Sequence, residues 1–227
     1  MKRELSSSVV ALACILTSAR AATVGFDDLP SPPALDSSTG LRFTTTPGDG
    51  SLYGGIIWDD RVTVAGDQYR VDTSTPGPLY GVPHSGNYFI TNESSADGGN
   101  GITLTTTMVL TGAWFGQNEY YGFGGGADEV TIHALNGATS LGFVTFALPE
   151  LNAGLPEPLS FVDTSSFTAL SGITGYRIDH NTPALFADTW VADDFQFASA
   201  SVPEPGATAV VAGALALGFA AWRRCRR

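Results

Sequence analysis

Lysine is almost absent from this chain of 227 residues, and cations of any kind are rare away from its ends. Lys2 is the single lysine. Residues 23–202 contain four arginines against 20 acidic residues, a net charge of −16. A protein that binds nucleic acid needs clustered lysine and arginine to hold phosphates. The composition therefore excludes nucleic acid as an expected partner.

Cysteine and helical periodicity are also scarce. Cys14 and Cys225 both lie in terminal segments, so the central part of the chain has no disulfide and no thiol chemistry. Charged residues make up 15% of the chain, against roughly 25% in ordinary soluble domains. No window shows sustained helical periodicity, and glycine and threonine are abundant, which together disfavour a helical bundle. The length allows one domain with targeting segments at its ends.

The first 21 residues have the three parts of a secretory signal peptide. Lys2 and Arg3 form a short basic region, and residues 9–16 form an apolar run that is too short to span a bilayer. Residues 19–21 then supply a small-x-small cleavage pattern, and we expect cleavage after Ala21. The alternative is a retained membrane anchor, and the short apolar run argues against it.

The last 26 residues, 202–227, combine three features in a fixed order. A Pro-Glu-Pro sequence comes first, and the uncharged residues 207–222 follow it. An arginine cluster then closes the chain. With its flanking anchors, the uncharged stretch is long enough to predict a single transmembrane helix. The arginines should stay on the cytoplasmic side of the inner membrane, which leaves the rest of the chain outside it.

This ordered tail resembles the PEP-CTERM sorting signal of Gram-negative bacteria that make extracellular polysaccharide. In that family the signal is recognised by exosortase, a membrane sorting enzyme that resembles a transpeptidase. The residues that match the sorting motif are Pro203, Glu204, Pro205, Arg223, Arg224, Arg226 and Arg227. The resemblance implies an inner-membrane intermediate and then delivery to the cell surface or extracellular matrix. It does not say what the exported domain does.

Residues 22–201 read as an all-β passenger domain, which we expect to fold alone as a monomer. Short β-rich runs alternate with turn clusters at roughly the 8–12-residue spacing of a β-sandwich. The sequence Asn136-Gly137 between two runs predicts a hairpin. Phe143, Val144 and Phe146 predict a buried strand after that hairpin. The expected strands cover 23–27, 41–46, 55–58, 61–65, 87–92, 102–110, 112–115, 129–135, 139–148, 160–163, 167–171, 175–179 and 190–198.

Three short segments of this domain are similar to passenger domains of PEP-CTERM proteins. They are the opening strand Val24-Gly25-Phe26-Asp27-Asp28-Leu29, the Tyr-Gly-Gly-x-x-Trp segment from Tyr53 to Trp58, and the closing strand Val191-Ala192-Asp193-Asp194-Phe195. The folds of those domains look like the jelly rolls of carbohydrate-binding modules. The resemblance therefore implies a jelly-roll-like β-sandwich.

Pairs of aspartates stand at both ends of the domain, Asp27-Asp28 in the first strand and Asp193-Asp194 in the last. Terminal strands of jelly rolls often lie side by side, so the four carboxylates could share a structural Ca²⁺, which takes six to eight oxygen ligands. The alternative is that these acids are solvated strand ends. Asp59-Asp60 and the loop at Asp97 are further acidic candidates.

No spacing in the chain indicates an enzyme. His84, His133 and His180 are widely separated and fit no zinc motif. No GxSxG nucleophile elbow is present. We therefore expect surface or hydrogen-bonded structural histidines and a protein that is not an enzyme.

Aromatic side chains are the best candidates for contact with a ligand, because sugar rings stack on aromatic faces. Tyr120 and Tyr121, before a glycine-rich loop, are the pair we favour. The other candidates are Tyr53, Trp58, Tyr69, Tyr80, Tyr88 and Trp114. Three functions stay open: a surface or matrix protein that binds polysaccharide, a purely structural or adhesive surface protein, and a secreted glycan hydrolase. The last lacks any recognisable catalytic spacing.

Overall fold

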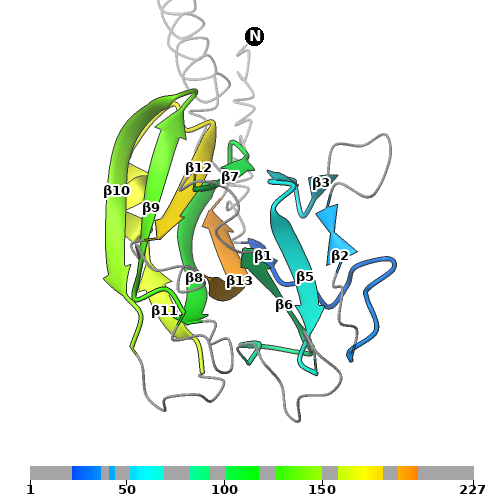
Figure 1. Ribbon diagram of the computed structural model, residues 1–227. Coiled ribbons are helices and arrows are strands. Elements are labelled where there is room, and N and C mark those ends of the chain that lie inside the picture. Colours follow the sequence, from blue (N-terminus) through cyan, green and yellow to red (C-terminus); the bar gives the residue numbers. More distant parts are fainter. Residues whose placement is uncertain are drawn as a thin grey trace, which may run out of the picture.

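The computed structural model describes residues 22–36, 41–43, 52–68, 82–92, 101–117, 126–149, 158–180 and 189–198. Within these ranges the chain forms two antiparallel sheets, which is the layout of a β-sandwich (Figure 1). The all-β prediction is confirmed. The predicted signal peptide and the sorting segment lie outside the described residues. Within the described ranges, no helix has the length and apolar character needed to cross a membrane.

The larger sheet has seven strands in the order β11-β8-β13-β6-β5-β2, and β1 pairs with β13 beside this path. Its strands are β1 (Ala22–Val24), β2 (Leu41–Arg42), β5 (Val62–Gly66), β6 (Tyr88–Asn92), β8 (Val109–Gln117), β11 (Ser160–Asp163) and β13 (Trp190–Ala198).

The smaller sheet has six strands in the order β10-β9-β12-β7-β4-β3. They are β3 (Leu52–Tyr53), β4 (Ile56–Trp58), β7 (Ile102–Thr105), β9 (Glu129–Asn136), β10 (Thr139–Ala147) and β12 (Gly175–His180). A 3₁₀ helix (η2, Ser165–Ala169) follows β11.

The core follows from the period-2 alternation of the strands. On β9, Val130, Ile132 and Ala134 are fully buried, while the residues between them face outward and are only partly buried. On β13, Phe195 and Phe197 share the buried face, as the sequence predicted. Each buried Val, Ile or Phe side chain contributes roughly 1.5–3 kcal/mol by leaving water. Burial of one face of each sheet therefore holds the two layers together.

Several strands have the predicted ends, and the hairpin is confirmed. β11 and β13 match their predicted ranges, and β9 and β10 pair around the predicted turn. Gly137 has φ of 56° there, a left-handed conformation that glycine adopts without strain. The predicted strand over 167–171 is wrong, because residues 165–169 form the 3₁₀ helix η2 with Phe167 turned into the core. The two-residue strand β3 was not predicted.

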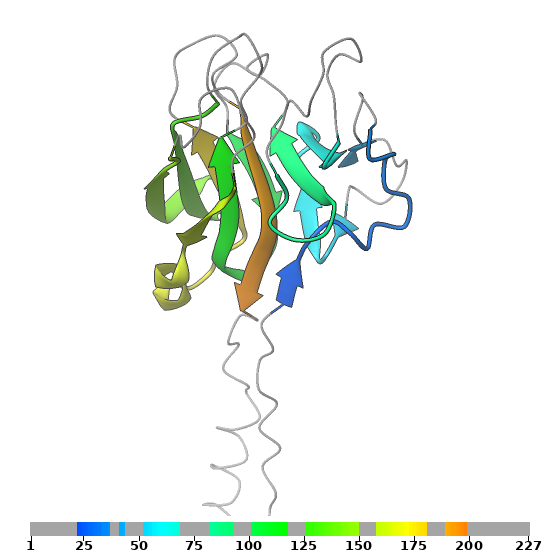
Figure 2. The ribbon, with the colours of Figure 1, turned by 90° about the horizontal axis from the view of Figure 1, so that it is seen from below.

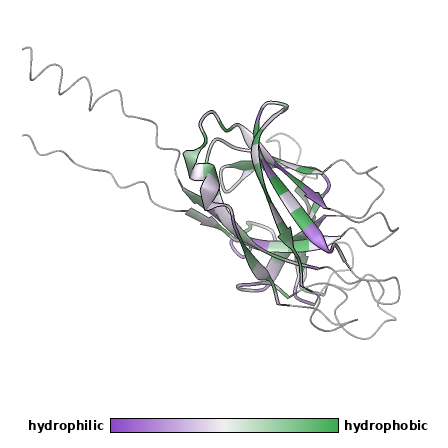
Figure 3. Ribbon diagram, turned by 90° about the vertical axis from the view of Figure 1, so that its left-hand side faces the viewer, coloured by the Kyte–Doolittle hydropathy of each residue, from purple (hydrophilic) through white to green (hydrophobic). Residues whose placement is uncertain are grey.

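The predicted buried strand around Phe143 is also wrong for Phe143 itself. β10 is the edge of the smaller sheet, and the Phe143 side chain is 64% exposed. Val144 and Phe146 face inward but are only partly buried. Apolar residues on both faces indicate a covered strand, yet here the outer face of an edge strand meets solvent (Figure 3 turns this side toward the viewer).

The first and last strands of the domain are neighbours, as predicted. β1 pairs with β13 so that Ala22 lies opposite Phe197 and Val24 opposite Phe195. Figure 2 shows these two strands side by side, in blue and orange. The described chain therefore begins and ends in adjacent strands, and residues near both termini meet in one region.

Candidate functional site

The strand β13 changes partner halfway along one side. It pairs with β6 through Val191 and Ala192, and with β1 from Phe195 onward. Asp193 and Asp194 lie between these pairings, where β13 also shifts register against β8. Asp194 has φ of 47°, which few residues other than glycine adopt. Such a bulge redirects side chains at a break in a ladder. We call the place where Asp27, Asp28, Asp193 and Asp194 meet the loop 84–87 the acidic junction.

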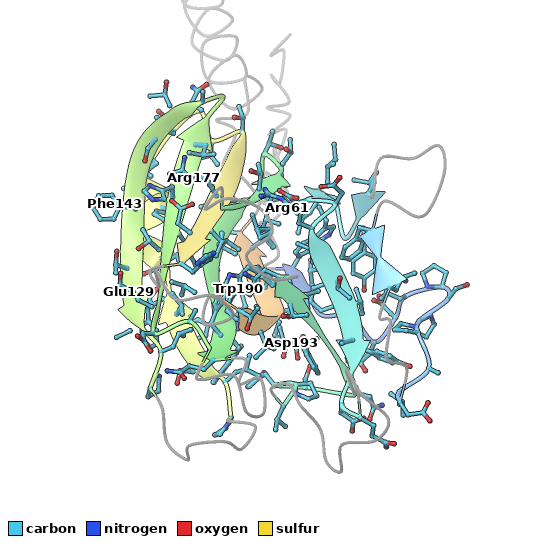
Figure 4. The ribbon with its side chains drawn as sticks, viewed as in Figure 1. Arg61, Glu129, Phe143, Arg177, Trp190 and Asp193 are labelled. Carbon is cyan, nitrogen blue, oxygen red and sulfur yellow. The ribbon has the colours of Figure 1, made fainter. Side chains whose placement is uncertain are left out.

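Asp193 is the centre of the junction and is fully buried. Its Oδ2 accepts a hydrogen bond from the Ser85 amide at 3.0 Å, and its Oδ1 accepts one from the Asp194 amide at 2.7 Å. A buried carboxylate without such donors is strongly disfavoured. Asp193 therefore holds the loop before β6 against the bulge of β13, below Trp190 in the view of Figure 4.

The other end of the chain holds the same loop. The Asp27 Oδ1 accepts a hydrogen bond from the Asn87 amide at 2.7 Å. Gly86 lies between Ser85 and Asn87, whose amides make these hydrogen bonds. It has φ of 59°, and a Cβ placed on it would lie 1.9 Å from the Asp27 Oδ2. Only glycine fits this position without a shift of the carboxylate. Aspartates from both ends of the domain thus fasten one loop.

Burial and crowding set the protonation of this site. Burial, together with the charges of Asp194 and Asp27, raises the pKa of Asp193 to about 6, although the hydrogen bonds from the Ser85 and Asp194 amides act in the opposite direction. The carboxyl is therefore much easier to protonate than an exposed aspartate. The junction concentrates negative charge and hydrogen-bond acceptors, which suit a cation or a hydroxyl-rich ligand.

A shallow cleft of about 260 Å³ opens beside the junction. The Tyr53 hydroxyl donates to the Gly25 carbonyl at 2.7 Å and also lies against the Asp28 carboxylate. Burial and the Asp28 hydrogen bond raise the pKa of Tyr53, so the phenol keeps its proton. The residues lining the cleft are Thr23, Val24, Gly25, Asp27, Asp28, Tyr53 and Gly54.

Beneath the cleft, aromatic rings join the three segments that carry the family resemblance. Phe26, Trp58 and Phe195 lie with ring centroids 5.3–6.4 Å apart, in edge-to-face contacts. The Trp58 Nε1 donates to the Tyr53 carbonyl at 3.1 Å across the β3–β4 turn. Gly54 must lack a side chain there, because a Cβ would lie 2.6 Å from Val24. These segments therefore form one structural unit.

On the other side of the junction, His84 links the acids to a pair of aromatic side chains, the partly buried Trp114 and the exposed Phe161. The His84 Nδ1 lies 2.7 Å from the Asp194 Oδ2. Its ring stacks on Trp114 with centroids 3.6 Å apart and an interplanar angle of 12°. Trp114 also contacts Phe161, which is 36% exposed. The arrangement places two aromatic faces beside a histidine and a carboxylate.

The structure brings all four predicted metal ligands, Asp27, Asp28, Asp193 and Asp194, to the junction, but hydrogen bonds from protein groups occupy oxygens of each. Among the described residues, no group of three or more histidine, cysteine, aspartate or glutamate side chains is arranged to hold a metal ion. Calcium binding at this site stays a prediction. Asp27 and Asp28 are exposed, as solvated acids would be, whereas Asp193 is buried.

Most other candidate residues have structural contacts or lie outside the described ranges. Asp59 pairs with Arg61. Trp58 is buried in the core, and the Tyr88 hydroxyl donates to the Pro33 carbonyl at 3.0 Å. The predicted ligand contacts that lie outside the described residues are Tyr120 and Tyr121, with Tyr69, Tyr80 and Asp97.

The three histidines lie on different elements, as the sequence indicated. His84 precedes β6 and contacts Asp194, and the His133 Nε2 on β9 lies 3.1 Å from the Asp179 Oδ2. His180 ends β12. The pairings of His84 and His133 fit the predicted hydrogen-bonded structural histidines.

Sequence reasoning missed three groups of the junction: the His84 side chain and the backbone amides of residues 85 and 87. No local pattern marks them, because His84 and Ser85 lie about 110 residues before their partners and Asn87 lies 60 residues after Asp27. Tyr53 was named as a ligand contact rather than as the partner of Asp28. The conformational demand on Gly86 was a usable signal, since a Ser-Gly-Asn turn before a strand is where backbone amides are left to be bonded.

Comparison with known proteins adds no assignment. No protein-family model matches the chain, and no curated protein matches it.

Proposed function

We propose that this chain is an exported, non-enzymatic protein of the cell surface or extracellular matrix, sorted by exosortase, whose jelly-roll-like domain binds polysaccharide. The observation that carries the proposal is the order of features in the tail. Pro-Glu-Pro comes first, an uncharged stretch with the length of a transmembrane helix follows, and an arginine cluster comes last. A simple membrane anchor would account for the helix and the arginines but not for Pro-Glu-Pro at that position.

The placement of the chain ends supports separate targeting segments around one folded unit. Cleavage after Ala21 would leave Ala22, the first residue of β1, free to pair with Phe197. β13 ends at Ala198, four residues before the tail begins at residue 202. Removal of either targeting segment therefore leaves every described strand whole.

The jelly-roll assignment rests on the way the chain passes between the sheets. After β4 in the smaller sheet, β5 and β6 lie in the larger one, β7 in the smaller, and β8 in the larger. The hairpin β9–β10 returns to the smaller sheet, and β11, β12 and β13 alternate again. Repeated crossing between two antiparallel sheets is typical of jelly rolls.

Polysaccharide binding rests on Trp114, which is partly buried, and the exposed Phe161 beside it. Sugar rings present CH-rich faces that stack on aromatic side chains, and nearby polar groups orient their hydroxyls. His84 and Asp194 supply a donor and acceptor next to the two rings. A structural or adhesive protein without a small ligand is the second candidate, and it predicts no glycan binding at this pair.

Sorting is tested by localisation in the native host. Pro203→Ala with Pro205→Ala, or alanine at the four terminal arginines, should keep the protein from its surface location and leave the melting temperature of the domain unchanged. Normal surface delivery of either variant would contradict sorting by exosortase.

Ligand binding is tested separately with a glycan array and the protein carrying Trp114→Ala. We expect binding to weaken roughly ten-fold, about 1.4 kcal/mol, with Ile57→Ala as a control on the other sheet. An array on which the unaltered protein binds nothing would favour the structural or adhesive candidate.

A further inference from the structure

We propose that the free edge of β10 pairs with β10 of a second copy of this chain, so that the protein self-associates edge to edge. The starting point is the position of β10 at the end of the six-stranded sheet, where its nine residues pair with β9 on one side. Within the described ranges no strand pairs with its other side. That side therefore presents a row of backbone amides and carbonyls to be bonded.

The sequence of β10 lacks the features that usually protect such an edge. The strand reads Thr-Ser-Leu-Gly-Phe-Val-Thr-Phe-Ala, without charge and without proline. Natural edge strands are commonly blocked by lysine, proline, short length or a bulge in the middle. The register shift of β10 falls between Ser140 and Gly142, near one end, which leaves 143–147 in regular pairing. Five regular residues are enough for a ladder.

Incomplete burial of the inward-facing side chains of β10 also favours association, because a partner strand would remove apolar surface from water. Val144 lies opposite Ile132 and Phe146 opposite Val130 in the β9–β10 register. Ile132 and Val130 are fully buried, whereas Val144 and Phe146 are only partly buried. A further strand beside β10 would cover them. On the outer face, Phe143 points away from the domain and is 64% exposed (Figure 4).

A second copy is the occupant that this edge fits. An antiparallel strand related by a two-fold axis presents to itself the same hydrogen-bonding edge, so one self-complementary surface makes the whole interface. The distribution of charge also favours pairing through β10. With a net charge of −16 over residues 23–202, most faces of two copies repel each other. β10 itself carries no acid. The acid nearest to it is Glu129 on β9, opposite Ala147 at one end of the strand, and Asp179, on β12, is paired with Arg177 through two hydrogen bonds at 2.8 Å.

The proposal goes beyond export and glycan binding, and it replaces the monomer that the sequence predicted. Joining two edges would extend the six-stranded sheet across both copies. A protein concentrated at a surface or in a matrix could then form paired units without a further partner.

Cross-linking of the purified full-length chain in detergent tests the pairing. Cys14 and Cys225 are first changed to serine, and a single cysteine is then introduced by Thr145→Cys on β10. The control is Ile57→Cys, an exposed position on β4 in the same sheet but between two partner strands. With a short bismaleimide, we expect a covalent dimer from Thr145→Cys and little from Ile57→Cys.

A lysine at the edge supplies the second readout. Adding Phe143→Lys to Thr145→Cys should lower the dimer yield about ten-fold, because a lysine on an edge strand disfavours pairing with another strand. Adding Ile57→Lys instead should leave the yield unchanged, and thermal unfolding checks that each variant is folded. Equal dimer yields from positions 145 and 57, no dimer at all, or a dimer that survives Phe143→Lys in folded protein would overturn the proposal. None of these results depends on sorting or on glycan binding.

Discussion

The Asp59 corner (Asp59, Arg61 and Thr103) and the acidic junction both bury carboxylate oxygens, but they hold them with different partners. At the corner, the Arg61 Nη2 lies 2.6 Å from the Asp59 Oδ2, and the Thr103 amide donates to the same oxygen at 2.9 Å. Burial alone would raise the pKa of Asp59, but the hydrogen bonds from Arg61 and Thr103 outweigh it and lower the pKa.

At the junction, the balance is reversed. Asp193 receives two amide hydrogen bonds, yet burial and the neighbouring acids raise its pKa to about 6. Backbone amides satisfy oxygen atoms without cancelling a full charge, whereas an arginine does both. With four arginines for 20 acids over residues 23–202, the chain cannot pair every carboxylate with a cation. The shortage of cations therefore raises the pKa of a buried carboxyl at the junction, where acids from the two ends of the domain meet, and not at the corner, where Arg61 is present.

The largest effect on stability should come from Gly86→Ala, which disrupts the contacts of the acidic junction and leaves the Asp59 corner unchanged. The new Cβ would collide with the Asp27 carboxylate, and alanine also resists a φ of 59°. We expect a loss of about 3 kcal/mol in unfolding free energy, measured by chemical denaturation. Gly137→Ala is the matched control, since its φ is 56° and nothing lies within 4 Å of the added atom. It should cost only about 1 kcal/mol, and equal losses at both glycines would contradict the collision.

Asp193→Asn should remove part of the pH dependence of stability. The folded protein binds the Asp193 proton more tightly than the unfolded chain does, so stability falls as pH rises from the ordinary carboxyl pKa of 3.8 to about 6. The loss above that window is on the order of 3 kcal/mol. Asparagine removes the buried charge, so the variant should show a flatter profile between pH 4 and about 6. Stability is measured by urea unfolding at each pH in the presence of chelator. If the variant and the unaltered protein had the same pH profile of stability, the raised pKa of Asp193 would be contradicted.

Calcium offers a third way to sharpen the comparison, since a divalent cation would supply the charge that the junction lacks. At 100 times its dissociation constant, the bound ion stabilises the fold by about 2.7 kcal/mol. We expect the melting temperature to fall on chelation, and the response to vanish in the double variant Asp27→Ala, Asp194→Ala. A melting temperature indifferent to chelator would rule out the site. A response that persists in the double variant would move it to Asp59-Asp60 or Asp97.

The smallest effect should come from Asp59→Asn, which weakens the corner. Its carboxylate contributes stability above the pKa of the unfolded side chain, and that stability is lost as pH falls, the opposite sign to Asp193. We expect a loss of about 1–2 kcal/mol near neutral pH, seen as a lower denaturation midpoint. Asp60→Asn, the exposed neighbour, is the control and should change little. Equal effects at both positions would mean that the Arg61 pair contributes nothing.

The sequence was sufficient for those features that depend on alternation and on chain order. β11 and β13 followed from their own residues, and the pairing of β1 with β13 followed from the resemblance to jelly rolls. Alternation does not reveal whether a strand is central or at an edge, so Phe143 was placed in the core. Residues 165–169 carry no helical period over a single 3₁₀ turn, so the sequence predicted a strand over 167–171 instead.

The partners within the junction could not be predicted, because they depend on tertiary structure. The contacts of His84 with Asp194 and of Ser85 with Asp193 join residues 110 and 108 positions apart. Both rely on a bulge that only the change of partner along β13 creates. The sequence placed the four aspartates together but gave no means of telling the buried Asp193 from the exposed Asp27.

The titration of the Asp193 carboxyl tests the central claim most directly, namely that the junction holds a buried acid on amides and without a neutralising cation. The carboxyl carbon of Asp193 can be followed by NMR against pH in the presence of chelator, with Asp193→Asn identifying its signal. The account predicts a midpoint at about 6. A midpoint at or below the ordinary 3.8 would contradict it, because burial and the neighbouring acids would then not outweigh the two amide hydrogen bonds.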